Sequence, residues 1–193
     1  IGFTGFALDQ TVSLVNYVMR LRGATGSAVT QVELHSISVL AGTDPGIIQP
    51  FIKIPGSAGV FTLDTYYWLE EAAPATGLEV LGVGSNVSVT GHSLGGHLAV
   101  MAIRLFPGLF DQAITFNAPG FDPLTSKELT DQFVNLFGGA LSIAPADTFA
   151  DIAGRVTAIE SESSEPGDDV SGVASLFTGI PVGQEVLIHT ENN

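Results

Sequence analysis

Cysteine is absent from the sequence, positive charge is scarce, and no long apolar run occurs. Without cysteine, the chain has no disulfide, no thiolate nucleophile and no Cys-ligated metal. Six Lys and Arg residues stand against 20 Asp and Glu residues, for a formal net charge of -14, so nucleic acid is not expected as a partner. Because no apolar run reaches the roughly 18 residues of a membrane span, the sequence predicts no transmembrane helix. The first residue is Ile1 rather than methionine, which predicts a processed or excised segment.

The residues that are present suit one folded domain over 1–193. Hydrophobic residues make up 45% of the chain and charged residues 13%, a balance that excludes disorder and supplies enough apolar material for a sheet covered on both faces. The acidic residues are scattered except for one cluster, formed by Glu160, Glu162, Glu165, Asp168 and Asp169. Their scatter favours a role in solubility, and the cluster is a candidate structural calcium site.

The N-terminal part of the chain begins with a helical pattern. Apolar residues over 8–19 repeat at helical spacing, and Gly23 follows as a stop signal. Between Val32 and Val39 the apolar residues alternate but change phase. This change predicts one bent strand or two short ones, with a break near 35–36.

The remainder alternates between predicted helices and predicted strands. Prolines and glycines in the segment 42–59 predict a long surface loop, and a helix is expected from Thr62 until Pro74 ends it. A β-rich segment, 87–90, is followed by a turn and by a helical pattern that ends before Pro107. Three further short apolar segments are expected to be buried strands, 113–116, 156–159 and 186–188. Strands separated by helices predict a parallel sheet.

The turn after the β-rich segment carries the most informative motif. Gly91-His92-Ser93-Leu94-Gly95 matches G-x-S-x-G, in which the serine sits on a sharp, strained turn between a strand and a helix. Side chains at 91 or 95 are expected to collide across this turn, and glycine at 96 lets the helix pack closely on the strand. A helix N-terminus favours negative charge, and the Leu94 amide is a candidate oxyanion donor. The alternative is an ordinary serine in a glycine-rich turn, but the flanking strand and helix patterns favour a nucleophile.

Two segments around this motif resemble the class 3 lipases. Residues 89–99, Val-Thr-Gly-His-Ser-Leu-Gly-Gly-His-Leu-Ala, closely resemble the nucleophile segment of that family, and residues 114–120, Ile-Thr-Phe-Asn-Ala-Pro-Gly, are similar to the strand and loop that follow. Residues 7–21 are more loosely similar to a helix in lipase domains of large secreted bacterial proteins with calcium-binding (RTX-type) repeats. The resemblance implies an α/β-hydrolase fold, complete or truncated, with a mainly parallel central sheet flanked by helices, and a secreted protein.

A serine nucleophile needs a base, and the base needs a carboxylate. Because α/β-hydrolases carry these groups in the chain order Ser, Asp or Glu, His, only His189 lies late enough to be the base. The resemblance implies Asp168 as the acid, since the segment 168–170 is similar to the family's Asp-x-Val site, with Asp169 and Asp122 as alternatives. In class 3 lipases the histidine usually follows a longer stretch, so a base beyond Asn193 is the alternative to His189.

A second oxyanion donor is expected from a loop after an earlier strand. Gly42-Thr43 is similar to the family's Arg-Gly-Ser or Arg-Gly-Thr site, although Ala41 stands where arginine is usual. The resemblance therefore implies Thr43 as this donor, with a donor before Ile1 as the alternative. The chemistry requires no metal or other cofactor.

These features predict a serine hydrolase that cleaves carboxylic esters through an acyl-enzyme, of the triacylglycerol lipase or phospholipase type. Its partners would be a lipid or ester substrate and, transiently, a lipid interface. Two apolar segments, Phe133–Phe149 and Ile47–Phe61, are candidate lids, with packing in the core as the alternative. Two other functions stay open: a short-chain esterase or thioesterase, and a catalytically inactive module that binds or supports other parts of a larger secreted protein.

Overall fold

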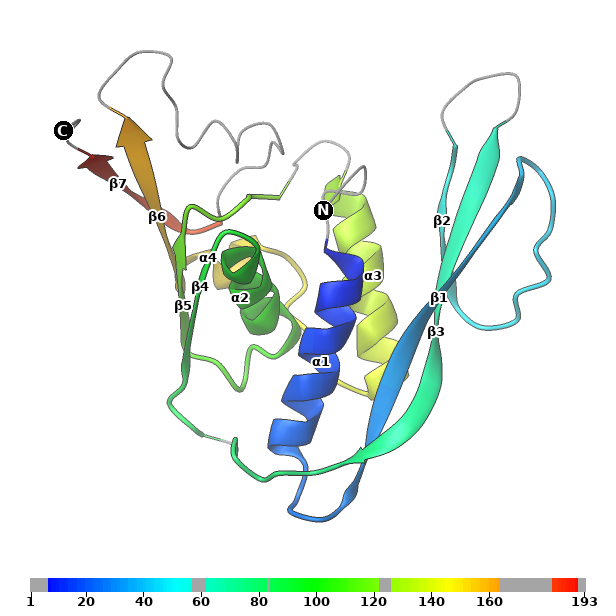
Figure 1. The fold of residues 1–193 in the computed structure, drawn as a ribbon, viewed down its shortest axis with the longest axis horizontal. Helices are drawn as coiled ribbons and strands as arrows, with labels where there is room; N and C mark the ends of the chain where they lie inside the picture. The colour runs from blue at the N-terminus through cyan, green and yellow to red at the C-terminus, as the bar shows by residue number, and fades with distance from the viewer. Residues whose placement is uncertain (1–6, 57–61, 83, 122–125, 164–181, 191–193) are drawn as a thin grey trace.

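A computed structural model describes residues 7–56, 62–82, 84–121, 126–163 and 182–190. Two sheets enclose a layer of helices in this structure (Figure 1). The elements in chain order are α1 (Leu8–Arg22), β1 (Ala28–Leu40), β2 (Phe51–Ile54), β3 (Leu63–Thr76), β4 (Ser88–His92), α2 (Leu94–Leu105), β5 (Gln112–Phe116), α3 (Ser126–Leu141), α4 (Ala150–Ala153), β6 (Val156–Ser163) and β7 (Gln184–Thr190). None of the helices among the described residues is long and apolar enough to span a membrane.

The four-stranded sheet is parallel and has the strand order β4-β5-β6-β7. Its strands confirm the prediction that the apolar segments 87–90, 113–116, 156–159 and 186–188 are strands. Helix α2 is the helix expected after the turn. Helix α2 packs on β4 and β5, so it covers the face that carries the buried Ala113 and Ala158. On the opposite face Phe116 and Ile188 are exposed, and no described helix covers them. The fold is thus α/β with a parallel sheet, and among the described residues no helix covers one face of that sheet.

The three-stranded sheet is antiparallel, has the order β1-β3-β2, and was not expected. The helix predicted from Thr62 to Pro74 is wrong, because these residues form strand β3. The run 65–68, Thr-Tyr-Tyr-Trp, has high β propensity and pairs with both β1 and β2. Pro74 is tolerated because it lies at a register shift, where Val29 pairs with Ala75 and Gln31 pairs with Ala72.

The break in β1 that was expected near 35–36 is wrong, because pairing between β1 and β3 is continuous from Gln31 to Leu40. The only irregularity in this pairing is the register shift between Val29 and Gln31. The first half of β1 is buried against α1, whereas its second half projects beyond the core and is largely exposed (Figure 1). Only the first half of β1 therefore needs apolar and polar residues to alternate. The change of phase in the apolar pattern between Val32 and Val39 corresponds to no break in the strand. The predicted loop 42–59 is also only partly right, because it contains β2.

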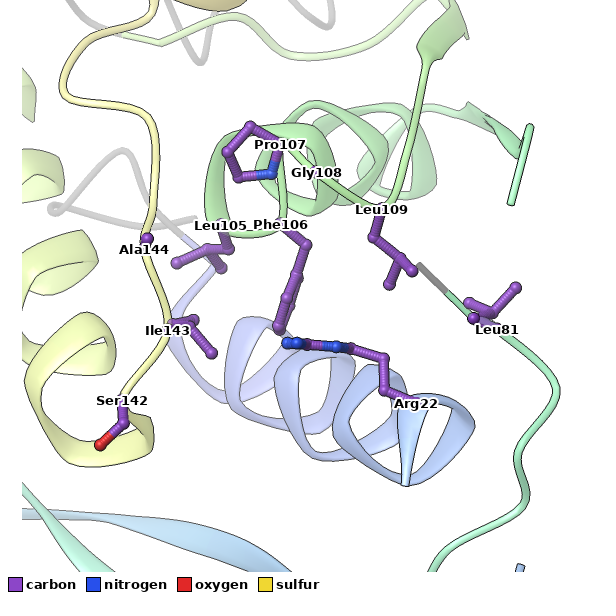
Figure 2. Close-up of a pocket in the computed structure, with 11 residues that line it drawn as sticks. Arg22, Leu81, Leu105, Phe106, Pro107, Gly108, Leu109, Ser142, Ile143 and Ala144 are labelled. Carbon is purple, nitrogen blue, oxygen red and sulfur yellow. The ribbon is translucent and has the colours of Figure 1, made fainter. Parts of the chain in front are cut away.

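Helix α2 runs from the nucleophile motif to the opposite end of the layer, where it borders a pocket (Figure 2). With 12 residues, α2 separates Ser93 from this pocket by about 18 Å. Its last residue, Leu105, and the following Phe106 face the C-terminal end of α1 across the pocket. The pocket is therefore distinct from the surroundings of Ser93.

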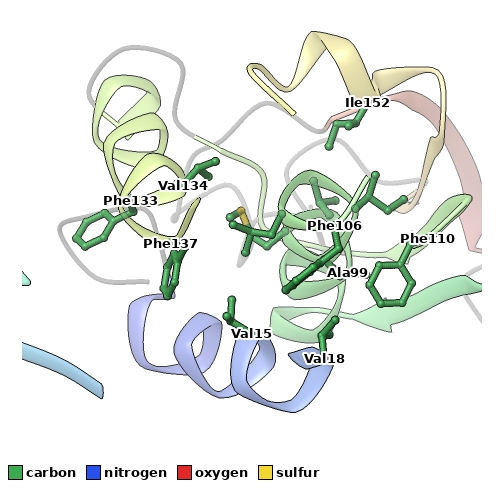
Figure 3. Packing of buried hydrophobic residues seen from close by; sticks show 14 of the residues in the cluster. Val15, Val18, Ala99, Phe106, Phe110, Phe133, Val134, Phe137 and Ile152 are labelled. Carbon is green, nitrogen blue, oxygen red and sulfur yellow. The ribbon is translucent and has the colours of Figure 1, made fainter. Parts of the chain in front are cut away.

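The core lies where α1, α2 and α3 meet between the two sheets (Figure 3). Val15 from α1, Met101 from α2 and Phe137 from α3 are each 0% exposed. Phe133 is also fully buried and contacts Tyr67 of β3 edge to face. The segment Phe133–Phe149 therefore contributes to the core and does not form a lid over a site. The other candidate lid, Ile47–Phe61, contains β2, and its residues 57–61 lie outside the described residues.

Candidate active site

Ser93 occupies the junction between β4 and α2 and is exposed to solvent. Its backbone has φ 53° and ψ -126°, which lies in the left-handed half of conformational space and is strained for a non-glycine residue. The Ser93 N–H donates to the Phe116 carbonyl at 2.9 Å, so the pairing of β4 with β5 continues to the nucleophile position. The Ser93 carbonyl then accepts from the Gly96 N–H at 2.9 Å and begins the helix. One residue therefore ends the strand and starts the helix, as the motif predicts.

Glycine is required at two positions of this turn. A Cβ at position 91 would lie 2.6 Å from the Gly96 nitrogen and closer still to the Gly95 carbonyl group. A Cβ at position 96 would lie 2.5 Å from the Ala118 Cβ and 3.2 Å from the Thr115 Cβ, so glycine there allows α2 to approach β5. The collision expected at position 95 is wrong, since a Cβ there would meet nothing within 4 Å.

The loop after β5 packs on the first turn of α2. His97 is fully buried, its ring stacks on Phe121 with centroids 4.2 Å apart, and its Nδ1 lies 3.4 Å from the Pro119 carbonyl oxygen. Burial lowers the pKa of His97 from 6.5 to about 4, and the hydrogen bond to Pro119 acts in the opposite direction. His97 is therefore neutral at pH 7, and its contacts with Pro119 and Phe121 hold the loop after β5 against the first turn of α2. It is not the catalytic base, because it is sealed from solvent.

Asn117 joins this loop to the next strand. Its backbone is also left-handed, with φ 44°, and its side-chain Oδ1 accepts from the Ser161 N–H at 2.7 Å and from the Ser161 hydroxyl at 3.1 Å. These bonds hold the carboxyl ends of β5 and β6 at the level of Ser93. The asparagine stands in the segment that resembles the lipase family, but its clamping role was not expected from the sequence.

Glu160 is a second residue whose role the sequence did not indicate. It lies on β6, two strands from β4, and is 7% exposed. Burial raises the pKa of its carboxyl group, a backbone hydrogen bond from Ala118 acts in the opposite direction, and the charge of Glu185 raises the pKa further. With strands about 4.8 Å apart, the backbone of Glu160 lies roughly 10 Å from β4. Its burial could not be inferred from the acidic cluster, which has the composition of a solvated loop.

The two predicted oxyanion donors differ in their surroundings. Leu94 is the first residue of α2, so its N–H has no carbonyl four residues earlier within the helix. Thr43 lies in the turn after β1, in the other sheet, and its N–H already donates to the Leu40 carbonyl at 2.9 Å. The structure therefore brings Leu94 next to Ser93 and does not bring Thr43 there. Because β1 is in a different sheet from β4, the role of Thr43 as an oxyanion donor stays a prediction.

The predicted base, His189, lies at the carboxyl end of its strand, as Ser93 does, but on a strand that is not adjacent to β4. His189 lies near the end of β7, where it pairs with Glu162, and its side chain is outside the described part of the structure. Because β7 is three strands from β4, its backbone is about 14 Å from that of β4. The candidate acids Asp168, Asp169 and Asp122 lie outside the described residues. The acid and the base therefore stay predictions.

The described residues contain no group of three His, Asp or Glu side chains placed to hold a metal ion. In the acidic cluster, the side chain of Glu162 and all of Glu165, Asp168 and Asp169 lie outside the described residues. The proposed calcium site is therefore untested. A serine turn of this kind needs no metal for acyl transfer.

No protein-family model matches the sequence, and no curated protein matches it either. Among solved structures, the chain is similar to MGS-MChE2, an α/β hydrolase enzyme from the metagenome of sediments from the lagoon of Mar Chica, Morocco. The identity is 16% and the TM-score 0.27, over 54% of this chain and 51% of that one, so the chain spans about half of the enzyme's length. A likeness of this extent does not assign a function.

Proposed function

We propose that the chain is a serine hydrolase of the α/β-hydrolase type that cleaves carboxylic esters, with Ser93 as its nucleophile. The carrying observation is the backbone of Ser93, which is held at φ 53° between β4 and α2 with its residue exposed. Strain of this kind costs of order 1–3 kcal/mol and persists only where the surrounding structure imposes it. Here glycine at 91 and 96 makes room for the tight turn, and the bond to Phe116 holds Ser93 at the end of β4. A positive φ alone does not mark a nucleophile, since Ser142 after α3 has φ 52°; Ser93 differs because it stands exposed at the strand-to-helix junction of the G-x-S-x-G motif.

The proposed chemistry begins with attack of the Ser93 hydroxyl on the ester carbonyl as a base removes its proton. The carbonyl oxygen becomes negative in the tetrahedral intermediate. The Leu94 N–H and the positive end of the α2 dipole stabilise that charge, and a donor of this kind typically contributes about 3 to 4 kcal/mol. The alcohol then leaves with the proton, and water hydrolyses the acyl-enzyme by the same route.

The base and the acid are proposed to be His189 and Asp168, with Asp169 or a histidine beyond Asn193 as alternatives. Parallel strands place their carboxyl ends at one edge of a sheet, so His189 at the end of β7 and Ser93 after β4 lie at the same edge. His189 itself lies within β7, whose backbone is about 14 Å from that of β4, so the distance between its side chain and Ser93 decides between His189 and the alternative base.

The substrate is proposed to be a lipid ester, as for a triacylglycerol lipase or a phospholipase-type acyl hydrolase, and the protein is proposed to be secreted. The support is the resemblance of residues 89–99 and 114–120 to the class 3 lipases. Exposed apolar side chains at Phe116 and Ile188, close to the edge that carries Ser93, are compatible with contact at a lipid interface.

The test is hydrolysis of p-nitrophenyl esters from acetate to palmitate by the full chain, by Ser93→Ala and by the control Ser36→Ala. Ser36 is an exposed serine on β1, away from the site. We expect Ser93→Ala to lose activity by about a thousandfold or more and the control to keep it. Retained activity in Ser93→Ala would overturn the proposal. A preference for acyl chains of eight carbons or more supports a lipase, whereas activity confined to acetate and butyrate supports a short-chain esterase.

A catalytically inactive module is the second candidate, and the separation of β7 from β4 is the observation that favours it. In that case neither hydrolysis nor reaction of Ser93 with an acylating probe should occur, although the protein is folded. Circular dichroism with a cooperative thermal transition would establish folding. A folded and inert chain would support this candidate and exclude the hydrolase.

A further inference from the structure

The pocket at the C-terminal end of α2 is not explained by ester hydrolysis. It has a volume of about 490 Å³, within the range of roughly 300–1,000 Å³ typical of sites for small molecules. Its apolar walls come from distant parts of the chain, namely Leu81, Leu105, Phe106, Leu109 and Ile143 (Figure 2). About 18 Å of helix separates it from Ser93, so a ligand here would not contact the nucleophile.

One cation, Arg22, stands at this pocket. Its guanidinium carbon lies 5.8 Å from the centroid of the Phe106 ring, and Figure 2 shows the group directed toward that ring. None of the ion pairs among the described residues involves Arg22, and no described acidic residue lines the pocket. Four other cations have oxygen partners: Arg20 binds the Thr76 carbonyl, Lys53 and Arg104 bind carboxylates, and Arg155 binds the Asp111 and Pro107 carbonyls. The side chain of Lys127, the sixth cation, is outside the described part of the structure. Arg22, which is exposed to solvent, is therefore the only cation with a described side chain that has no oxygen partner.

The walls of the pocket are held by backbone hydrogen bonds. The Val80 and Leu81 N–H groups both donate to the Leu21 carbonyl, at 2.8 and 2.9 Å, which fixes Leu81 across the end of α1. On the other side, the Ile143 N–H donates to the Gly138 carbonyl at 3.2 Å and positions Ile143 after α3. The apolar walls and the cation are thus placed before a ligand arrives, which lowers the ordering cost of binding.

We propose that this pocket binds an amphiphilic carboxylate, with the hydrocarbon chain against the apolar walls and the carboxylate on Arg22. A guanidinium matches a carboxylate through two parallel hydrogen bonds, and at 5.8 Å from the Phe106 ring centroid Arg22 is also within range of a cation–π interaction. In a protein with net charge -14, most of the surface repels an anion, so an anionic ligand has to be recognised where a cation is unpaired. The inference does not rest on the proposed hydrolase activity.

The test is isothermal titration calorimetry with dodecanoate, below its micelle concentration, on the full chain and three variants. Arg22→Gln removes the charge, and Ala144→Phe fills space at the pocket wall with the charge kept. Arg20→Gln is the matched control, because Arg20 is on the same helix end but does not line the pocket. We expect dodecanoate to bind about tenfold more weakly to Arg22→Gln and to Ala144→Phe, and to bind the control as it binds the unaltered protein.

Two ligand controls separate charge recognition from apolar adsorption. Dodecanol should bind equally to the unaltered protein and to Arg22→Gln, and dodecyltrimethylammonium should bind more weakly than dodecanoate. Equal dodecanoate affinity in all four proteins, absence of dodecanoate binding below millimolar concentration, or tighter binding of the cationic surfactant would each overturn the proposal. Unchanged thermal unfolding of the variants establishes that any loss is not a loss of fold. A Ser93→Ala variant should bind dodecanoate normally, which keeps this outcome distinct from that of the hydrolase test.

Discussion

Acidification should destabilise the protein through one buried histidine. His97 is 0% exposed, and burial lowers its pKa from 6.5 to about 4 in the folded state. The folded protein therefore holds the ring neutral at a pH at which the unfolded chain already protonates it. Between these two values the unfolded state binds more protons than the folded state, so the free energy of unfolding falls as the pH falls.

The magnitude follows from the size of the pKa difference. Each pKa unit corresponds to about 1.4 kcal/mol, so the shift of His97 from 6.5 to about 4 corresponds to about 3 kcal/mol. This contribution is fully present above the unfolded pKa of 6.5 and is lost progressively as the pH falls to about 4. A domain is stable by only about 5–15 kcal/mol, so the loss is a large part of the total.

The assay is guanidinium unfolding at pH 7, 6, 5 and 4.5, on the unaltered protein, on His97→Gln and on the control Ser36→Ala. Ser36 is an exposed residue on β1 that carries no titratable group and lies away from the turn. His97→Gln should be less stable at pH 7, and its deficit relative to the unaltered protein should narrow on acidification. The control should follow the unaltered protein. A deficit in His97→Gln that is the same at every pH would refute the reasoning.

Three other substitutions test the fold and the site. Gly91→Ala should lower stability by about 1–3 kcal/mol because its Cβ meets the Gly95 carbonyl, whereas Gly95→Ala should be tolerated; equal melting temperatures for the two would contradict the geometry of the turn. Glu160→Gln should be more stable than the unaltered protein at pH 7, because burial raises the pKa of the carboxyl and charging it costs stability. That gain should vanish below the ordinary carboxyl pKa in a pH series, and a pH-independent gain would refute the assignment. Phe137→Ala should cost about 3–5 kcal/mol in denaturant unfolding, against less than about 0.5 kcal/mol for the exposed Leu40→Ala, and similar costs would mean that the core is elsewhere.

The parallel sheet and the serine turn were predictable because their signals are local. A β-rich run, a G-x-S-x-G turn and an amphipathic helix follow one another directly, and the structure has β4, Ser93 and α2 in that order. Short apolar runs between helical segments likewise indicated β5, β6 and β7. Each of these elements is specified mainly by its own residues.

The antiparallel sheet was not predictable in the same way, because it depends on pairing between distant segments. The run 65–68 looks helical when its apolar spacing is considered alone, and only its pairing with β1 and β2 makes it a strand. The roles of Glu160 and Asn117 were not predicted for a related reason. Burial of a carboxyl on β6 and the clamp from Asn117 to Ser161 become visible only when two strands are placed side by side.

The central claim, that Ser93 is an activated nucleophile, is tested most directly by intact mass and peptide mapping after exposure to a fluorophosphonate. We predict one phosphonyl adduct on the full chain, located at Ser93, and no adduct on Ser93→Ala. A folded chain that stays unmodified, or one modified at another serine while Ser93 is free, would contradict the claim.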